Sequence, residues 1–445
     1  AHWETTMKTL NRVGLAALSL MLSTSVAFAQ TEVTWWHAMG GELGEKLEEI
    51  VAGYNASQSD YVVTPVYKGS YAETMTAAIA AFRAGEQPEI VQVFEVGTGT
   101  MMAAKGAVYP VYQLMADMGA DFDPSAFLPT VVGYYTDTEG NMLSMPFNSS
   151  TPIMYYNKDV FAAAGLDPEM PPKTWEELEA FSRQIMESGA ATCGFTSGWI
   201  SWAQLENFSA WHNQPIGTLE NGFGGLDTEF VVNGPLQAKH WENLKNWQDE
   251  GVFQYGGPGG GADAPSKFYT GECAIYMNSS ASRAGVLANA EGFEVGFGML
   301  PHYEEVEPQN SIIGGATLWV LQGADEAQYQ GVADFFSYLS SAEVQADWHQ
   351  FSGYLPITQA AYELGQEQGY YEANPGSDVA IKQMTLNAPT ENSKGLRFGN
   401  YVQIRDVIDQ EFQALLTGDK SAQQALDDLV SRGNQMLRDF QAANQ

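Results

Sequence analysis

Two tryptophans three residues apart are the most informative residues of this sequence. Trp199 and Trp202 lie in the stretch 197–208, beside polar neighbours such as Ser201 and Gln204. Residues three apart share one face of a helix, so a helical turn would place both indoles together. An indole has a large apolar surface and one N–H donor, which suits the binding of a small ligand with a carbon skeleton. The spacing alone favours the plainer interpretation, that both are ordinary core residues.

Motifs for catalysis and metal binding are scarce. The histidines after residue 29 show neither the i, i+4 spacing of zinc proteases nor pairing with cysteines, and stand at 37, 212, 240, 302 and 349. No Gly-x-Ser-x-Gly or dinucleotide fingerprint occurs, and the glycine-rich stretch 255–266 lacks the Lys-Ser/Thr ending of a phosphate loop. Carboxylate pairs arise by chance among 54 acidic residues. A binding protein without metal or cofactor is favoured over an enzyme.

Apolar periodicity predicts alternating strands and helices at the start of the folded chain. We expect these elements in order: a strand at 33–37, a helix at 43–54, a strand at 61–67, a helix opened by the capping box Ser70–Glu73 and stopped at Gly85, and a strand at 89–95. Repeated βαβ units imply an α/β fold with a parallel sheet between helices.

The rest of the chain is long enough for a second lobe. Residues 141–157 are interpreted as two extended runs split by 147–152, which fits a crossover between lobes. Further on we expect a helix from Thr174 to Gly189, a connecting loop at 255–266, a strand at 313–320, helix from 404 and a last helix capped by Ser421. About 415 residues exceed one ordinary core. We expect lobe 1 at 30–149 plus 312–353, and lobe 2 at 150–311 plus 354–445.

The N-terminal residues have the pattern of a secretory signal. Lys8 and Arg12 precede an apolar run at 13–22, and Ala27-Phe28-Ala29 is a small-x-small cleavage site. We interpret 1–29 as an upstream extension followed by a cleaved signal peptide. No cysteine stands at the start of the chain that cleavage would leave, so we expect an exported periplasmic protein without a lipid anchor.

The net charge of −34 excludes some partners and sets a condition on others. Such a field repels nucleic acid and anionic membrane surfaces, so neither is expected as a partner. An anionic ligand would have to be held by local donors. Cys193 and Cys273 could form a disulfide or remain two buried thiols, because sequence does not place their Cα atoms.

Several segments, taken in order, carry a family resemblance. The segments lie at 35–44, 67–71, 92–102, 146–152, 198–211, 312–316, 348–358 and 403–405. In this order they closely resemble the periplasmic sn-glycerol-3-phosphate-binding proteins of ABC importers, within extracellular solute-binding protein family 1. Residues 267–275 are similar to the wider family's Phe-x-x-Gly-x-x-Ala-Met signature, with Ile275 in place of the methionine. The resemblance spans almost all of the chain after residue 29.

The resemblance implies a two-lobed, maltose-binding-protein-like (type II) α/β fold with its ligand in the cleft between the lobes. It further implies a monomer that captures sn-glycerol 3-phosphate, or a glycerophosphodiester such as glycerophosphocholine, and delivers it unchanged to an inner-membrane permease with a cytoplasmic ATPase. The family's ligand contacts fall on Tyr71, Glu95, Ser150, Trp199, Trp202, Ser279, Gly315, Tyr354 and Arg405.

The residue types agree with these implied roles. The planar guanidinium group of Arg405 has donors that match the oxygens of a phosphate. The carboxylate of Glu95 could accept hydrogen bonds from glycerol hydroxyls, and its negative charge would disfavour bare inorganic phosphate. Neutral donors from Ser150, Ser279 and the Gly315 N–H would help to hold an anion, tyrosines 71 and 354 would close over the glycerol carbons, and the tryptophans would form an apolar wall. The alternatives are an exposed ion pair for Arg405, a solvated strand end for Glu95, a strand bulge at Gly315 and turn packing for the tyrosines.

Two other functions stay open at this point. A sugar-binding importer component would share the fold and the signature. A secreted phosphodiesterase or glycosidase would have to turn its substrate over, and the missing metal-ligand motifs argue against it.

Overall fold

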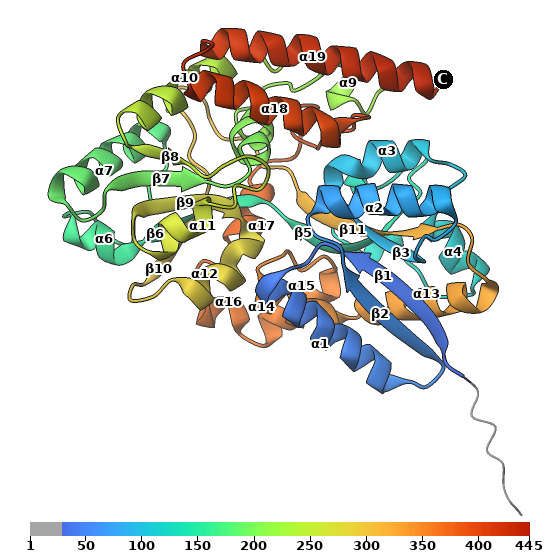
Figure 1. Ribbon diagram of the computed structural model, residues 1–445. Helices are drawn as coiled ribbons and strands as arrows, with labels where there is room; N and C mark the ends of the chain where they lie inside the picture. Colours follow the sequence, from blue (N-terminus) through green and yellow to red (C-terminus); the bar gives the residue numbers. More distant parts are fainter. Residues whose placement is uncertain (1–28) are drawn as a thin grey trace, which may run out of the picture.

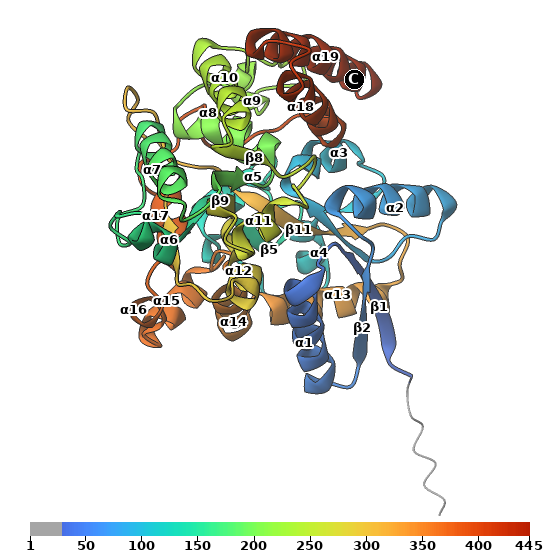
Figure 2. The ribbon, with the colours of Figure 1, turned by 60° about the vertical axis from the view of Figure 1, so that its left-hand side comes forward.

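The computed structural model describes residues 29–445 and contains two β-sheets flanked by helices (Figures 1 and 2). The predicted signal peptide and the extension before it lie outside the described residues, apart from Ala29. The first sheet has the order β2-β1-β3-β11-β4, and β5 also pairs with β11. Its strands are β1 (Thr31–His37), β2 (Tyr61–Tyr67), β3 (Ile90–Phe94), β4 (Val108–Tyr109), β5 (Met145–Ser150) and β11 (Gly314–Leu321). The predicted early strands are confirmed, and β1 runs parallel to β2 and β3.

The second sheet has the order β10-β6-β9-β7-β8. Its strands are β6 (Pro152–Asn157), β7 (Cys193–Ser197), β8 (Phe253–Tyr255), β9 (Cys273–Ser279) and β10 (Val295–Gly298). Residues 193 and 273 are paired across the parallel strands β7 and β9, and their side chains form a disulfide. The question that the sequence left open is thereby answered for this structure.

Helices cover both sheets. Those packed around the first sheet include α1 (Gly41–Ser57), α2 (Tyr71–Ala84), α3 (Thr98–Ala103), α4 (Val111–Asp117), α5 (Pro129–Tyr134) and α13 (Glu326–Leu339). The predicted capping box of α2 is confirmed: the Glu73 N–H donates to Ser70 Oγ at 3.2 Å, and the Ser70 N–H donates to the Glu73 carboxylate at 3.3 Å. Gly85 ends α2 in the left-handed region, at φ 73°.

The second sheet carries a longer set of helices. These are α6 (Lys158–Ala163), α7 (Trp175–Ser188), α8 (Asn207–Trp211), α9 (Thr218–Asn221), α10 (Pro235–Asp249), α11 (Ala264–Tyr269), α12 (Arg283–Asn289), α18 (Tyr401–Leu416) and α19 (Ala422–Ala443). Four more lie between α13 and α18: α14 (Ala342–Ser352), α15 (Gln359–Glu367), α16 (Tyr370–Ala373) and α17 (Val379–Met384). The lobe boundaries drawn from the sequence stay a prediction.

One residue separates the two sheets in the middle of the chain. β5 ends at Ser150 and β6 begins at Pro152, so only Thr151 lies between them. The prediction that 147–152 is a break between extended runs is therefore wrong, because residues 148–150 pair with β11 as part of β5 and residue 152 already belongs to β6. Across this junction Ser150 pairs with Gly314, and Pro152 pairs with Ser279. The junction brings the ends of β5, β9 and β11 together.

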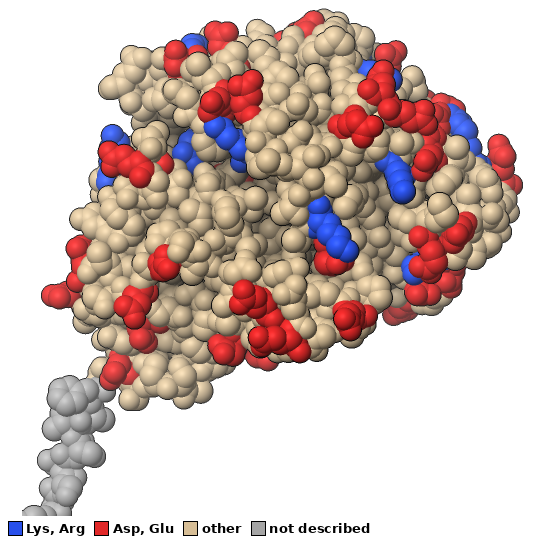
Figure 3. Space-filling model, turned by 180° about the vertical axis from the view of Figure 1, so that it is seen from behind, with Lys and Arg blue, Asp and Glu red and all other residues tan. Residues whose placement is uncertain are grey.

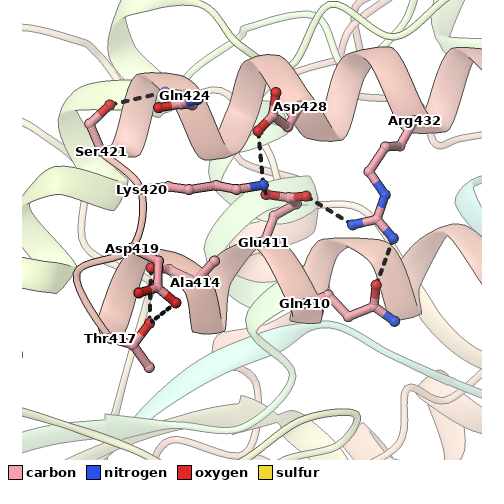
Figure 4. A network of polar contacts seen from close by, with 10 residues as sticks. All are labelled: Gln410, Glu411, Ala414, Thr417, Asp419, Lys420, Ser421, Gln424, Asp428 and Arg432. Atoms are coloured by element: carbon pink, nitrogen blue, oxygen red, sulfur yellow. Dashed lines mark hydrogen bonds and ion pairs between the residues drawn. The ribbon is translucent and has the colours of Figure 1, made fainter.

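Helix α18 is fastened to α19 by a buried carboxylate (Figure 4). Glu411 is 2% exposed, and its two oxygens accept from Lys420 at 2.7 Å and from Arg432 at 2.8 Å. Lys420 also pairs with Asp428 on α19. This cluster holds one end of α18, and Arg405 lies near the other.

Acidic side chains are spread over the face of the molecule shown in Figure 3, with fewer basic ones among them. No helix in residues 29–445 has both the length and the apolar character needed to cross a membrane.

Candidate functional site

One cavity of about 80 Å³ is lined by all nine residues singled out from the sequence. They come from both sheets and from segments more than 300 residues apart, and Phe94 completes the lining. The full set is Tyr71, Phe94, Glu95, Ser150, Trp199, Trp202, Ser279, Gly315, Tyr354 and Arg405. Their convergence on one cavity is a finding, whereas their contact with a ligand stays a prediction.

The two tryptophans reach the cavity from different backbone settings. Trp199 has φ 48° and precedes the helical segment, so the expected shared helical face is wrong. Trp202 opens a π-helical turn, η3 (Trp202–Glu206), which continues into α8. A tryptophan in the left-handed region and a π-helical turn are both uncommon. Unusual backbone conformations of this kind are found most often at binding and catalytic sites. The indole N–H of Trp202 is buried and has no protein partner.

Two glycines make room for the indoles. A Cβ at Gly314 would lie 2.3 Å from Cζ2 of Trp202, and a Cβ at Gly260 would lie 3.2 Å from Cε2 of Trp199. Each indole therefore lies against bare backbone. The glycine-rich loop, predicted only as a connector, supports one wall of the cavity in this way. Asp409 on α18 anchors the loop, since its Oδ2 accepts from the Gly259 N–H at 2.9 Å.

Three ionisable side chains form what we call the charged corner: Glu95, Glu206 and Arg405. All are nearly inaccessible, at 4%, 0% and 6% exposure. Arg405 donates to Glu206 from Nε at 3.0 Å and from Nη2 at 2.6 Å, and Nη2 also donates to Glu95 Oε1 at 3.0 Å. The Tyr401 hydroxyl adds a 3.0 Å hydrogen bond to Glu206 Oε2. The alternative of an exposed ion pair for Arg405 is wrong, because the pairs are buried.

Burial sets the protonation of this corner. It raises the pKa of Glu95 to about 7, with the charge of Arg405 opposing the rise and that of Glu206 adding to it. Burial alone would lower the pKa of Arg405, but the charges of Glu206 and Glu95 outweigh it and raise that pKa. Arg405 is therefore a permanent cation, and Glu95 is the group that titrates near neutral pH.

Sequence reasoning missed Glu206 and Phe94. Glu206 stands four residues after Trp202, so a helical turn places both on one face, and a carboxylate in an apolar helix was the available sign. Phe94 immediately precedes Glu95 and stacks on Tyr71, with ring centroids 5.2 Å apart and an interplanar angle of 11°. Nothing in the sequence distinguishes a phenylalanine at the end of a strand that lines a site from one that belongs to the hydrophobic core.

The lining also contains a group of neutral donors, which we call the neutral corner: Ser150, Ser279, Gly315, Tyr71 and Tyr354. The strand junction brings the first three together. Burial raises the pKa of both tyrosines, so their hydroxyls stay protonated at neutral pH. Asn148 donates to the Tyr71 hydroxyl at 3.0 Å, and the Tyr71 hydroxyl can donate in turn to that of Tyr354.

Gly315 can be no other residue in this backbone. Its φ is 96°, and a Cβ there would lie 2.1 Å from the Asn148 carbonyl oxygen. The register of β11 with β5 shifts further along the strand, between residues 316 and 317, where Phe147 of β5 is left without a partner. Gly315 lines the cavity without a side chain, so only its backbone can face a ligand there.

This fold and site define a class of binding protein. The family model described as bacterial extracellular solute-binding protein matches residues 49–377. The chain belongs to that family, and the predicted fold class is confirmed by its structural neighbours. Maltose-bound MalE3 of T. maritima has a TM-score of 0.75 at 18% identity, covering 92% of this chain and 100% of that one. UgpB of Mycobacterium tuberculosis, in complex with glycerophosphocholine, has a TM-score of 0.76 at 19% identity, covering 93% and 100%.

The sequence is much closer to a narrower group. The sn-glycerol-3-phosphate-binding periplasmic protein UgpB of Yersinia pseudotuberculosis is 52% identical over 431 residues, which is 96% of this chain and 97% of that protein. UgpB of Salmonella typhimurium is 50% identical over 434 residues, covering 96% and 98%. The resemblance stated from the sequence is confirmed, and this chain is a member of that group. Within residues 29–445, no cluster of three or more His, Cys, Asp or Glu side chains is placed to hold a metal ion.

Proposed function

We propose that this protein is the substrate-binding component of an ABC importer for sn-glycerol 3-phosphate and for glycerophosphodiesters such as glycerophosphocholine. The observation that carries the proposal is the cavity itself. It combines a charged corner, a neutral corner and an aromatic wall, which match the hydroxyls, the phosphate and the carbon skeleton of such a ligand. The names of relatives at about 50% identity support the same ligand class.

The geometry suggests how the ligand is oriented. The Nε and Nη2 donors of Arg405 are already taken by Glu206 and Glu95, and Nη1 has no acceptor among residues 29–445. A phosphate placed there would also face two carboxylates. We therefore place the phosphate at the neutral corner and the glycerol hydroxyls against Glu95 and the Nη1 of Arg405. This differs from the sequence-based hypothesis, in which Arg405 itself bound the phosphate.

The cellular setting follows from the family. We propose that the protein works in the periplasm without a lipid anchor, as a monomer, and hands its ligand to the inner-membrane permease that a cytoplasmic ATPase drives. The site binds and releases, and no bond is made or broken. A large negative charge does not prevent anion binding, because the phosphate meets only local neutral donors.

Calorimetric titration of the mature protein tests the proposal. Glycerol 3-phosphate and glycerophosphocholine are each expected to bind, with a free energy of about −8 kcal/mol at micromolar affinity. Inorganic phosphate and maltose are the controls, and neither is expected to bind comparably. Saturable binding of maltose alone would assign the cavity to sugars. Choline released during incubation with glycerophosphocholine would identify a phosphodiesterase instead.

Replacing Arg405 tests the charged corner. Arg405→Ala is expected to weaken glycerol 3-phosphate binding by roughly 2–5 kcal/mol, because it leaves two buried carboxylates unpaired beside an anionic ligand. Arg183→Ala, an exposed arginine on α7 with its own carboxylate partners, is the matched control and should bind normally. Unchanged calorimetric affinity in Arg405→Ala would remove Arg405 from the site.

A further inference from the structure

A second and larger cavity lies beside the first sheet, under helices α2 and α3. Its volume is about 600 Å³, within the range of pockets that bury small organic ligands. The two helices run close together in both Figure 1 and Figure 2, and residues 103–107 also line the pocket. None of its lining residues belongs to the cavity described above. It needs an explanation of its own.

The floor of this pocket is apolar and well buried. It is formed by six side chains with at most 7% exposure: Met75, Ala78, Val91, Val93, Met101 and Leu321. The methionines at 75 and 101 are flexible and polarizable, so they can adjust to ligands of differing shape. Such a floor suits an alkyl chain rather than a polar ligand.

The charge of the lining is opposite to that of the molecule. Two cations, Arg83 and Lys105, line the pocket, and both are exposed to solvent. No carboxylate lines it, although acidic residues outnumber basic ones 54 to 20 in the chain. Neither side chain takes part in any ion pair or hydrogen bond among the described residues. Their positive charge is therefore available to a ligand.

From this pairing of an apolar floor with two free cations we infer that the pocket binds an amphiphilic anion with a single alkyl chain. The chain would lie on the methionine-lined floor, and its carboxylate or phosphate head would face Arg83 and Lys105. A fatty acid and a lysophosphatidic acid share this chemistry. The inference goes beyond the proposed transport function, because it concerns a different cavity.

Calorimetric titration of the mature protein with four decyl compounds tests the inference. Decanoate and decyl phosphate carry the expected anion, decanol has the same chain without charge, and decyltrimethylammonium has the opposite charge. Saturable binding of either anion, well below its micellar concentration and stronger than that of decanol, supports the site. The tighter of the two anions identifies the head group. Equal binding of decanol, or no saturable binding of either anion, would overturn the inference.

Variants locate the binding. In Arg83→Gln/Lys105→Gln the anion affinity is expected to fall roughly two- to thirtyfold, which is the effect of two solvent-exposed charge pairs. Lys173→Gln/Lys382→Gln removes the same net charge elsewhere and should bind normally. Ala78→Phe fills the pocket and should abolish binding while glycerol 3-phosphate titration shows an intact fold. Anion binding that survives both the Gln pair and Ala78→Phe, or that Trp202→Ala removes instead, would refute the assignment.

Discussion

At the scale of single residues, the protonation of Glu95 is the quantity most open to measurement. Glu95 shares one cation with Glu206, and one positive charge does not compensate two buried carboxylates. Burial disfavours the charged carboxylate and is the main reason why the pKa of Glu95 rises to about 7, and the charge of Glu206 adds to the rise while that of Arg405 opposes it. Near neutral pH the charged corner therefore exchanges a proton with solvent unless a ligand fixes its state.

This raised pKa predicts a pH-dependent stability. The folded state holds the Glu95 proton up to about pH 7, whereas the unfolded state releases it near its ordinary value of 4.5. The stabilising contribution is thus complete below pH 4.5 and is lost as the pH rises through 7. Relative to Glu95→Gln, the wild type should lose up to about 3 kcal/mol of unfolding free energy between pH 4.5 and pH 8, measured by urea denaturation without ligand.

Measuring the wild type against Glu95→Gln separates the effect of Glu95 from that of other groups that titrate in the same range. Burial lowers the pKa of His37, His212 and His349 to about 4 each, so these side chains destabilise the fold as the pH falls, in the opposite sense to Glu95. They are common to both proteins and cancel in the difference. A difference that does not change with pH would show that Glu95 is ionised throughout the range.

The candidate residues were predictable from the sequence only where a motif carried them. Glycine at 315 and the tryptophans at 199 and 202 lie within long matching segments. Glu206 lies in the same segment, yet its part depends on Arg405 approaching from 199 positions away along the chain. An ion pair between residues so far apart in the chain depends on tertiary packing, and it could not be predicted from the local sequence around Glu206.

At the scale of elements, the π turn of η3 depends on how closely it can approach β11. Gly314→Ala is expected to displace the Trp202 indole, weaken glycerol 3-phosphate binding and cost about 1–3 kcal/mol of stability through overpacking. Gly260→Ala is the matched control, because its added Cβ meets Trp199 at 3.2 Å rather than 2.3 Å. Calorimetry and thermal denaturation of both variants measure the two effects. Similar losses in the two variants would contradict the steric explanation.

The attachment of α18 to α19 is expected to affect stability without affecting binding. Glu411→Ala removes two charged hydrogen bonds from a buried carboxylate and should cost about 1–3 kcal/mol. Asp428→Ala breaks a more exposed pair of the same cluster and should cost less than about 1 kcal/mol. Urea denaturation ranks the variants, and unchanged ligand affinity in both would show that the cluster is structural. A loss of affinity in Glu411→Ala would instead show that α18 needs this anchor to place Arg405.

Local rules predicted some elements well and failed at one important place. The capping box at Ser70 and the stop at Gly85 are short-range features, so α2 could be predicted closely. The run Asn-Ser-Ser-Thr-Pro at 148–152 has turn composition, but pairing with β11 holds residues up to 150 in a strand. Strand preference depends on the neighbouring strand more than on the residues themselves. The same pairing brings Ser150 and Gly315 of the neutral corner together, so the wrong prediction at 147–152 concerned residues of the candidate site itself.

At the scale of the whole molecule, the cavity lies where the two sheets meet, and Figures 1 and 2 show β5 and β11 between the remaining strands of the first sheet and those of the second. Both sheets contribute to the lining: Ser150 and Gly315 come from the first and Ser279 from the second. The lining side chains of the charged corner are almost inaccessible. We therefore expect a ligand to reach them only when the two sheets move apart, which would couple binding to closure.

This coupling predicts a change of shape on binding. Small-angle X-ray scattering of the mature protein should give a smaller radius of gyration with saturating glycerol 3-phosphate than without it, because a ligand in this cavity would join donors from both sheets and favour the closed form. Arg405→Ala at the same ligand concentration serves as the control and should keep the larger value, since its occupancy is low. A wild-type radius that is already small without ligand, and does not change on saturation, would mean that the closed form is stable by itself. Loss of the ligand would then not be enough to open the cavity, and opening would also require the ion pairs of Arg405 with Glu95 and Glu206 to break.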